Sequence, residues 1–470
     1  MAAKRRALAE RRRSVGLSQE RLAEALEVEP STVGRWERGE TAPQPWFRPK
    51  LARALAVSVE ELDHLLVEVE SLTIEEQRSG TSRRVDGLRR TDPAEGVNDD
   101  PDNDPMLSAP WSHRGTVEAA VVLSGGDWRV DRRCFGLLAG AALTVPAHQW
   151  LIHDPDPLVA GLSGGHVSAT LADQLPTMIT TLRTMDDVAG GGTVLSLAQQ
   201  AFDWVARLLD QASYDERTGR KLYSALAELG QLTGWVAHDA GQSGLGQRYH
   251  IAALHAAHSA DDRPLGAHIL ACMADQAARH GRPAEAVTLI DTAAVGVRGR
   301  ETPRLLAELY IRKAYALAIL QDASACTTAV SKARTQVEEF ESEPDNDPLW
   351  LYWVSPAEIT AGAGDCLLQL GRAEEATALL DNGIAMFDES FTRDRQIYLT
   401  HLADALARPG KQRDLDAAVD RGLAAVLLTE SLASTRAIEC LHELYARMQP
   451  HAPAPAVRDF LQRARAVLAA

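Results

Sequence analysis

Small residues recur at a fixed spacing around predicted turns in the second half of the chain, and this repeat limits the possible fold more than any other feature. Around a turn at Gly281, alanine occurs seven residues before, five after and twelve after the glycine. The pattern returns at Gln321, then at Gly371 after an insertion at 343–355, and with a longer turn at Gly410. The small residues are Ala274, Ala286, Ala293, Ala314, Cys326, Ala333, Gly364, Ala376, Gly383, Ala403, Ala418 and Ala425. Because they let two antiparallel helices pack closely, their repetition predicts stacked helical pairs with a concave face.

Composition and spacing together favour an all-α fold. Alanine is abundant and aromatic residues make up only 5% of the chain, which disfavours strands. The repeat resembles degenerate tetratricopeptide repeats, with a spacing longer than the usual ~34 residues. We expect a tetratricopeptide-like α-solenoid over 221–470, with a divergent first pair at 222–262 and a cap at 431–468. A helical connecting region over 114–220 precedes it, in which 183–187 is interpreted as a helix end.

A second informative stretch, residues 17–39, has the pattern of two short helices joined by a turn. Ser18 can cap the first helix, while Pro30 suits the first turn of the second helix, which ends at Gly39. The apolar residues that recur at helical spacing, and so define one buried face, are Leu22, Ala23, Leu26, Val33 and Trp36. The stretch therefore predicts a helix-turn-helix.

The opposite face of the second helix carries a hydroxyl and two guanidiniums, on Ser31, Arg35 and Arg38. Such groups hydrogen-bond base edges in the DNA major groove. For Arg35 we favour a base contact, with a phosphate contact and a solvated position as alternatives. Residues 1–56 contain 12 Lys and Arg against 7 Asp and Glu, although the whole chain carries a net charge of −16. A basic DNA-binding domain on an acidic body explains this division.

The stretch 4–66 resembles the Cro and phage-repressor type of helix-turn-helix, the XRE family. The resemblance rests on Leu17-Ser18-Gln19 and Trp36-Glu37-Arg38-Gly39. It implies a five-helix domain whose DNA contacts come from Gln19, Ser31, Thr32, Arg35, Arg38 and Thr41. Within this set, Ser31 and Arg35 would contact base edges, and Gln19, Arg38 and Thr41 would contact the phosphate backbone. It also implies a structural ion pair between Arg12 and Glu37.

Two residues depart from the family's pattern. Pro30 stands where a hydrogen-bonding side chain is common, and it can offer only an apolar contact, such as one to a thymine methyl. Glu29 stands where Ser or Thr usually caps the helix, and its carboxylate is unfavourable beside phosphates unless it accepts a hydrogen bond from cytosine N4. The set of base contacts is therefore narrower than in the family.

Between the predicted domain at 1–70 and the helical body, residues 71–113 are expected to be a flexible linker. Apolar periodicity is lost from about Glu75 to His113, and residues 98–105 are acidic and rich in proline. An acidic activation segment is the alternative, but the stretch lacks the interleaved hydrophobic residues of such segments.

Several kinds of chemistry are disfavoured by the sequence. The cysteines Cys134, Cys272, Cys326, Cys366 and Cys440 show no C-x-x-C spacing, so neither a disulfide framework nor a zinc site is expected. No run of about 18 apolar residues suggests a membrane span. Neither a Walker loop nor a G-x-S-x-G elbow is present. We therefore expect a cytoplasmic protein without membrane partner, cofactor or catalytic activity.

The best metal candidate is a group of histidines in one region, His238, His250, His255, His258, His268 and His280. His255 and His258 share a helix face, but the group lacks an H-E-x-x-H arrangement or a cysteine at ligand spacing. We expect solvated or groove-lining histidines and no metal. In the insertion, Trp350, Tyr352 and Trp353 either pack the solenoid, which we favour, or line a groove for a partner or ligand.

The combination of an XRE-type domain and such a repeat array resembles a large group of actinobacterial transcription regulators and, more distantly, peptide-pheromone receptors of Gram-positive bacteria. It implies a regulator that binds double-stranded DNA as a homodimer and whose repeat domain binds a peptide, small-molecule or protein effector. One alternative is an interaction scaffold whose helix-turn-helix domain docks protein. A more remote one is a zinc-dependent hydrolase at the histidine group.

Overall fold

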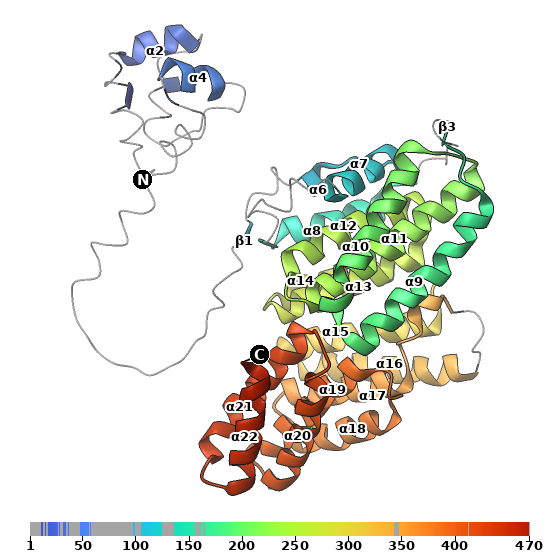
Figure 1. Cartoon of the computed structure of the whole chain (residues 1–470), viewed down its shortest axis with the longest axis vertical. Helices are drawn as coiled ribbons and strands as arrows, with labels where there is room; N and C mark the ends of the chain where they lie inside the picture. Colours follow the sequence, from blue (N-terminus) through green and yellow to red (C-terminus); the bar gives the residue numbers. More distant parts are fainter. Residues whose placement is uncertain are drawn as a thin grey trace. The chain divides into compact units, whose positions relative to one another are not determined.

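The chain divides into two compact units, Met1–Thr91 and Asp92–Ala470, which Figure 1 shows in one drawing. We call them the N-terminal unit and the C-terminal unit. The computed structural model describes residues 11–12, 15, 17–26, 28, 32–33, 36, 48–55, 57, 97–98, 105–124, 136–155, 161–162, 165–342, 347–411 and 413–469. Within these ranges no helix combines the length and the apolar character that crossing a membrane requires.

The N-terminal unit contains helices α2 (Gln19–Leu26) and α4 (Arg48–Ala54) (Figure 1). The backbone N–H of Arg21 donates to Ser18 Oγ over 3.2 Å, so the predicted cap of the first helix is confirmed. The core residues of this unit are Leu22, Ala23, Leu26, Val33, Trp36, Leu51, Ala52 and Leu55. They include every apolar residue of the buried face that the sequence predicts. The predicted second helix, which begins at Pro30 and ends at Gly39, lies largely outside the described residues.

The C-terminal unit is a series of helices packed as hairpins, and the all-α fold with a helical-repeat body is confirmed (Figure 1). It begins with α6 (Pro105–Ser108), α7 (His113–Ser124) and α8 (Ala141–Ile152). The hairpins that follow are α9 (Ala169–Ala189) with α10 (Gly191–Gln211), α11 (Glu216–Asp239) with α12 (Ser243–Ser259), α13 (Arg263–Arg279) with α14 (Pro283–Gly296), α15 (Pro303–Ile319) with α16 (Ala323–Ser342), α17 (Pro356–Gln369) with α18 (Ala373–Met386), α19 (Thr392–Ala407) with α20 (Leu415–Thr429), and α21 (Thr435–Met448) with α22 (Pro455–Leu468).

Short elements complete the C-terminal unit. Two 3₁₀ turns, η5 (Leu349–Leu351) and η6 (Gln449–His451), precede α17 and α22. Strand β1 (Val97–Asn98) pairs in parallel with β2 (Leu137–Leu138), and β3 (Gly161–Leu162) pairs antiparallel with β4 (Ser213–Tyr214). Helix α6 lies inside the range predicted to be linker, and its Met106 belongs to the core.

The predicted turns of the repeat lie between paired helices. Gly281, Gln321 and Gly371 follow α13, α15 and α17, with φ angles of 73°, 61° and 75°. A Cβ added at Gly281 or Gly371 would meet no atom within 4 Å, so the backbone conformation, rather than space, favours glycine there. Gln321 adopts the same conformation with a side chain, which is uncommon for a residue other than glycine.

The small residues of the repeat pattern lie where paired helices contact each other. All twelve of the small residues in the repeat pattern are buried. A Cβ on Gly383 of α18 would lie 2.6 Å from the backbone N of Ala361 in α17, and one on Gly364 would lie 2.8 Å from Cγ of Leu380. These helices therefore approach too closely for a methyl group at either glycine.

The array of hairpins closes on itself. The backbone N–H of Gly192, in the first turn of α10, donates to the carbonyl of Ala433 over 2.8 Å. Ala433, in the turn between α20 and α21, donates in return to the carbonyl of Ala189 over 2.9 Å. Helix α9 also contacts α19. The first hairpin of the array is thus joined to its last ones.

Candidate functional site

The predicted DNA-binding residues are only partly within the described ranges. Gln19 begins α2 and is half-buried, and Thr32 is helical and half-buried. Arg12 is buried and donates from Nη1 to the carbonyl of Leu17 over 2.7 Å. The residues outside the described ranges are Ser31, Arg35, Glu37, Arg38 and Thr41. Their DNA contacts and the Arg12–Glu37 ion pair therefore stay predictions.

The C-terminal unit contains a cavity of about 970 Å³, a volume that includes space open to solvent. We call it the central cavity. Its lining comes from the first helix of each hairpin, α9, α11, α13, α15, α17, α19 and α21, together with residues 352–353 before α17. Because a helix presents residues three and four apart on one face, each of these helices contributes only a few side chains. The cavity is the concave side that the repeat predicts.

One wall of the central cavity carries three guanidiniums around one carboxylate, a group that we call the basic pole: Asp275, Arg279, Arg312 and Arg436. The Arg279 Nε and Arg312 Nη1 atoms lie 3.0 and 2.6 Å from the Asp275 carboxylate. Burial alone would raise the pKa of Asp275, but the three guanidiniums lower it well below its ordinary range. This carboxylate is therefore ionised.

The indole of Trp235, on α11, is surrounded by cations. The guanidinium carbons of Arg436, Arg312 and Arg393 lie 4.7, 5.5 and 5.7 Å from its ring centroid. Arg312 also lies 5.0 Å from the ring of Trp353. Cation–π attraction at this distance helps to hold the guanidiniums in a partly desolvated site.

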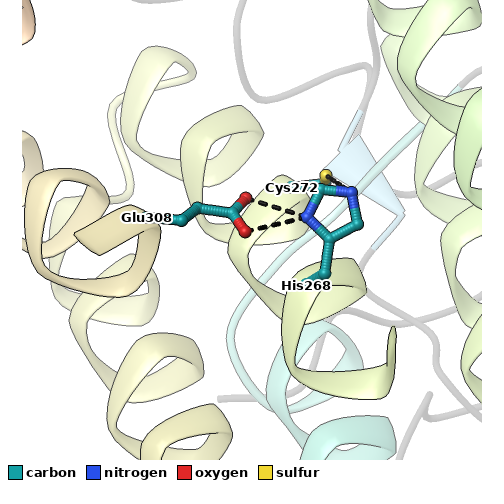
Figure 2. Close-up of side chains that lie close together, drawn as sticks. All are labelled: His268, Cys272 and Glu308. Carbon is teal, nitrogen blue, oxygen red and sulfur yellow. Dashed lines mark hydrogen bonds and ion pairs between the residues drawn. The ribbon is translucent and has the colours of Figure 1, made fainter. Parts of the chain in front are cut away.

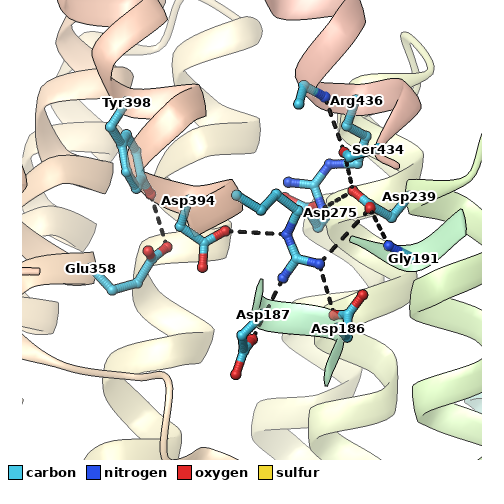
Figure 3. Close-up of polar contacts among 12 residues, drawn as sticks. Asp186, Asp187, Gly191, Asp239, Asp275, Glu358, Asp394, Tyr398, Ser434 and Arg436 are labelled. Atoms are coloured by element: carbon cyan, nitrogen blue, oxygen red, sulfur yellow. Dashed lines mark hydrogen bonds and ion pairs between the residues drawn. The ribbon is translucent and has the colours of Figure 1, made fainter. Parts of the chain in front are cut away.

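A second group, the acidic pole, has the opposite balance, with one guanidinium among four carboxylates: Arg393, Asp186, Asp187, Asp239 and Asp394. Arg393 lies 2.7 Å from Asp186 and 3.5–3.9 Å from the other three carboxylates. Figure 3 shows these four carboxylates as sticks. Burial raises the pKa of Asp186 and raises that of Asp187 to about 7, although Arg393 acts against both shifts. One cation does not compensate this group fully.

Asp239, of the acidic pole, also connects the first and last hairpins of the array. Its carboxylate accepts hydrogen bonds from the backbone N–H of Gly191 over 2.9 Å and from the hydroxyl of Ser434 over 2.8 Å (Figure 3). These partners belong to the first and last hairpins of the array, so closure and charge clustering depend on the same carboxylate.

Glu358 extends the acidic side of the central cavity. Burial and the nearby Asp394 raise its pKa to about 7, while the Tyr398 hydroxyl donates to it over 2.9 Å (Figure 3). The Tyr352 hydroxyl donates in the same way to Asp187, over 2.5 Å. The acidic side therefore holds carboxyl groups that gain or lose a proton near neutral pH.

The three predicted aromatic residues take different positions in the structure. Tyr352 and Trp353 line it, whereas the buried Trp350 stacks on the ring of His268 with centroids 4.8 Å apart. Trp350 thus packs the fold, and Tyr352 and Trp353 face the space that a ligand would occupy. Their binding role stays a prediction.

The histidine group differs only in part from the prediction of solvated or groove-lining side chains, since His268 lines the central cavity. His238, His250, His255, His258 and His268 are buried rather than solvated, because α11, α12 and α13 lie in the interior of the C-terminal unit. Burial lowers the pKa of His250 and of His255 to about 3, so both rings are neutral. The His255 ring stacks on Trp111 with centroids 3.9 Å apart.

The expectation that no cysteine lies at ligand spacing from a histidine is wrong for His268. Among the described residues one trio, His268, Cys272 and Glu308, places potential metal-ligand atoms within 4.8 Å of one another. Cys272 lies one helical turn after His268 on α13, and Glu308 lies on α15 (Figure 2). All three side chains are buried.

The contacts of His268 favour an ion pair at this trio. Its Nδ1 lies 2.9 Å from both carboxylate oxygens of Glu308 (Figure 2). Burial would lower the pKa of His268, but Cys272 and Glu308 raise it to about 10. A metal would have to displace this proton before binding the ring. The imidazolium stacked on Trp350 accounts for the arrangement, and the absence of a metal stays a prediction.

A family model described as a helix-turn-helix domain matches residues 5–65 of the chain. No curated protein matches the chain. The matched range agrees closely with the stretch 4–66 that the sequence assigns to such a domain, and it supports DNA binding by the N-terminal unit.

Sequence reasoning missed the charged lining of the central cavity. Residues 183–187 were expected only to end a helix, and they do lie in the last turns of α9, but Arg183, Asp186 and Asp187 also line the cavity. A usable signal was the presence of charged residues on helices otherwise made of small and apolar ones, such as Asp275 and Arg279 on α13.

Proposed function

We propose that the chain is a sequence-specific transcription regulator of the XRE type, in which the helix-turn-helix domain binds DNA. The helix-turn-helix match at residues 5–65 carries this proposal. It includes a cytoplasmic location, where the DNA partner is available, and it assigns the chain neither a catalytic reaction nor a cofactor.

The proposal gives the tetratricopeptide-like C-terminal unit two roles, dimerisation and effector binding. The −16 net charge and the basic N-terminal stretch mean that a single DNA-binding domain works against repulsion between the rest of the chain and phosphate. A homodimer would place two recognition helices ~34 Å apart on a pseudo-palindromic operator and so add their contacts. The central cavity, with its charged and aromatic lining, supports the effector role.

Genome-wide DNA occupancy of the full chain tests the regulator. We expect enriched sites that share a pseudo-palindromic sequence, and purified protein should retain that sequence over a scrambled duplex of equal length. Occupancy without any enriched sequence would overturn the proposal. It would favour the interaction scaffold instead, for which Glu29 and Pro30 at the start of the recognition helix are the supporting observation.

A further inference from the structure

The two poles of the central cavity have opposite charge balance. The basic pole holds Arg279, Arg312 and Arg436 around Asp275, whereas the acidic pole holds four carboxylates around Arg393. The poles adjoin, because Arg436 Nη1 lies 3.9 Å from Asp239 of the acidic pole. The two poles therefore offset each other's charge in part, and Glu308 and Glu358 also act on Arg312.

Unpartnered atoms occur at both poles. Among the described residues, Arg436 Nε, Arg436 Nη1 and Arg312 Nε have no hydrogen-bond acceptor, and Asp186 Oδ1 has no donor. The side chains of Arg436 and Asp186 are only 9% and 4% exposed. Buried polar groups are normally hydrogen-bonded, since leaving one unpaired is costly. The cavity thus presents donors on one side and an acceptor on the other.

We propose that the central cavity binds a small zwitterion of the amino-acid type, with its carboxylate at Arg312 and Arg436 and its ammonium at Asp186. This inference rests on the effector role proposed above and names the chemistry of the effector. A purely anionic ligand would complete the basic pole and leave the acidic pole uncompensated, and a purely cationic ligand would do the reverse. A molecule with both charges supplies acceptors and donors where each is missing.

The aromatic lining and the raised pKa values agree with such a ligand. Trp235 lies between the poles and offers an apolar surface to the body of the molecule, together with Trp353. An ammonium group near Asp187 and Glu358 would favour their ionised forms, which burial disfavours. Ligand binding would then release protons near neutral pH.

Calorimetric titration of the full chain with each of the standard L-amino acids, without DNA, tests the inference. We expect at least one to bind and to raise the melting temperature. Its N-acetyl form and its carboxamide form should each bind about ten- to a hundredfold more weakly, because each lacks one charge. The inference is overturned if no free amino acid binds, or if the blocked forms bind as well as the free one.

Two variants test whether the carboxylate of the ligand binds at Arg436. In Arg436→Gln the free amino acid should lose about tenfold or more in affinity, whereas the carboxamide should lose little further, since the two changes remove the same contact. Arg421→Gln on the exposed side of α20 is the matched control and should change neither. Equal losses for both ligand forms would indicate a merely structural effect and overturn the assignment of the carboxylate.

These outcomes separate the inference from the regulator proposal. Amino-acid binding is measured without DNA, and operator selection is measured without ligand. Loss of the first with the second intact overturns only the ligand class.

Discussion

The N-terminal unit packs large apolar side chains such as Leu22, Trp36 and Leu51 into its core, whereas the repeat hairpins of the C-terminal unit bury alanine and glycine between paired helices and hold charged side chains around a cavity. The first arrangement leaves polar residues to face outward, toward a surface as large as DNA. The second encloses its polar residues, and a ligand must enter among them. The same chain thus combines a site predicted on a convex surface with one on a concave surface.

The largest expected effect comes from removing the one cation of the acidic pole in the C-terminal unit. Arg393→Ala leaves four carboxylates, three of them buried, without their shared cation, so we expect a loss of about 3–5 kcal/mol in the free energy of unfolding. Urea unfolding of the full chain, followed by circular dichroism, measures it. Arg421 is exposed and pairs with the exposed Asp381, so Arg421→Ala should cost no more than about 1 kcal/mol. Similar losses in both variants would contradict the central position of Arg393.

A smaller effect tests the close packing of the repeat hairpins. Gly383→Ala places a methyl group 2.6 Å from the backbone of Ala361, and we expect it to cost about 1–3 kcal/mol. Gly165→Ala is the control, because a Cβ there meets nothing within 4 Å. Thermal melting of both variants measures their loss of stability. An unchanged melting temperature in Gly383→Ala would show that the two helices can move apart at little cost in free energy.

The predicted DNA-binding site is tested by Arg35→Ala. If Arg35 contacts a base, its removal should cost about 1–3 kcal/mol of discrimination between operator and scrambled DNA. Helicity by circular dichroism should not change. The control is Arg458→Ala, on the exposed side of α22. Electrophoretic retention of the two duplexes measures the ratio of the affinities for operator and scrambled DNA. An unchanged ratio in Arg35→Ala would refute the base contact.

The last expected effect is a pH dependence of the inward-facing site. Asp187 and Glu358 have a pKa of about 7 in the folded chain, above their ordinary values of 3.8 and 4.5. The folded state therefore keeps protons that the unfolded state has released, so their contribution to stability is full below about pH 4 and is lost as the pH rises to about 7. Glu358→Gln should reduce the decrease in unfolding free energy between pH 5 and pH 8 by about 2 kcal/mol.

The comparison for this variant is Glu375→Gln, which changes an exposed carboxylate on α18. It should keep the wild-type slope between pH 5 and pH 8. A slope that does not change in Glu358→Gln either would mean that this carboxyl is ionised throughout the range.

The features predicted from sequence depend on neighbours along the chain. The cap at Ser18 and the buried face with Trp36 follow from helical periodicity over a few residues, and the hairpin turns at Gly281 and Gly371 follow from a local repeat. The charged cavity could not be predicted in this way. Asp186 and Arg393 meet only because the array closes, and the curvature that closes it is a sum of small angles that no short pattern encodes.

Closure has a consequence for how this chain can change in evolution. An open solenoid can grow or shrink by duplication or loss of a repeat, because each repeat contacts only its neighbours. Here the hydrogen bonds between Gly192 and Ala433 and between Ala433 and Ala189 require a fixed number of hairpins between α9 and α21. An added hairpin would separate these partners and open the ring. Descendants of this sequence are thus expected to diversify by substitution at the lining, while the number of repeats stays constant.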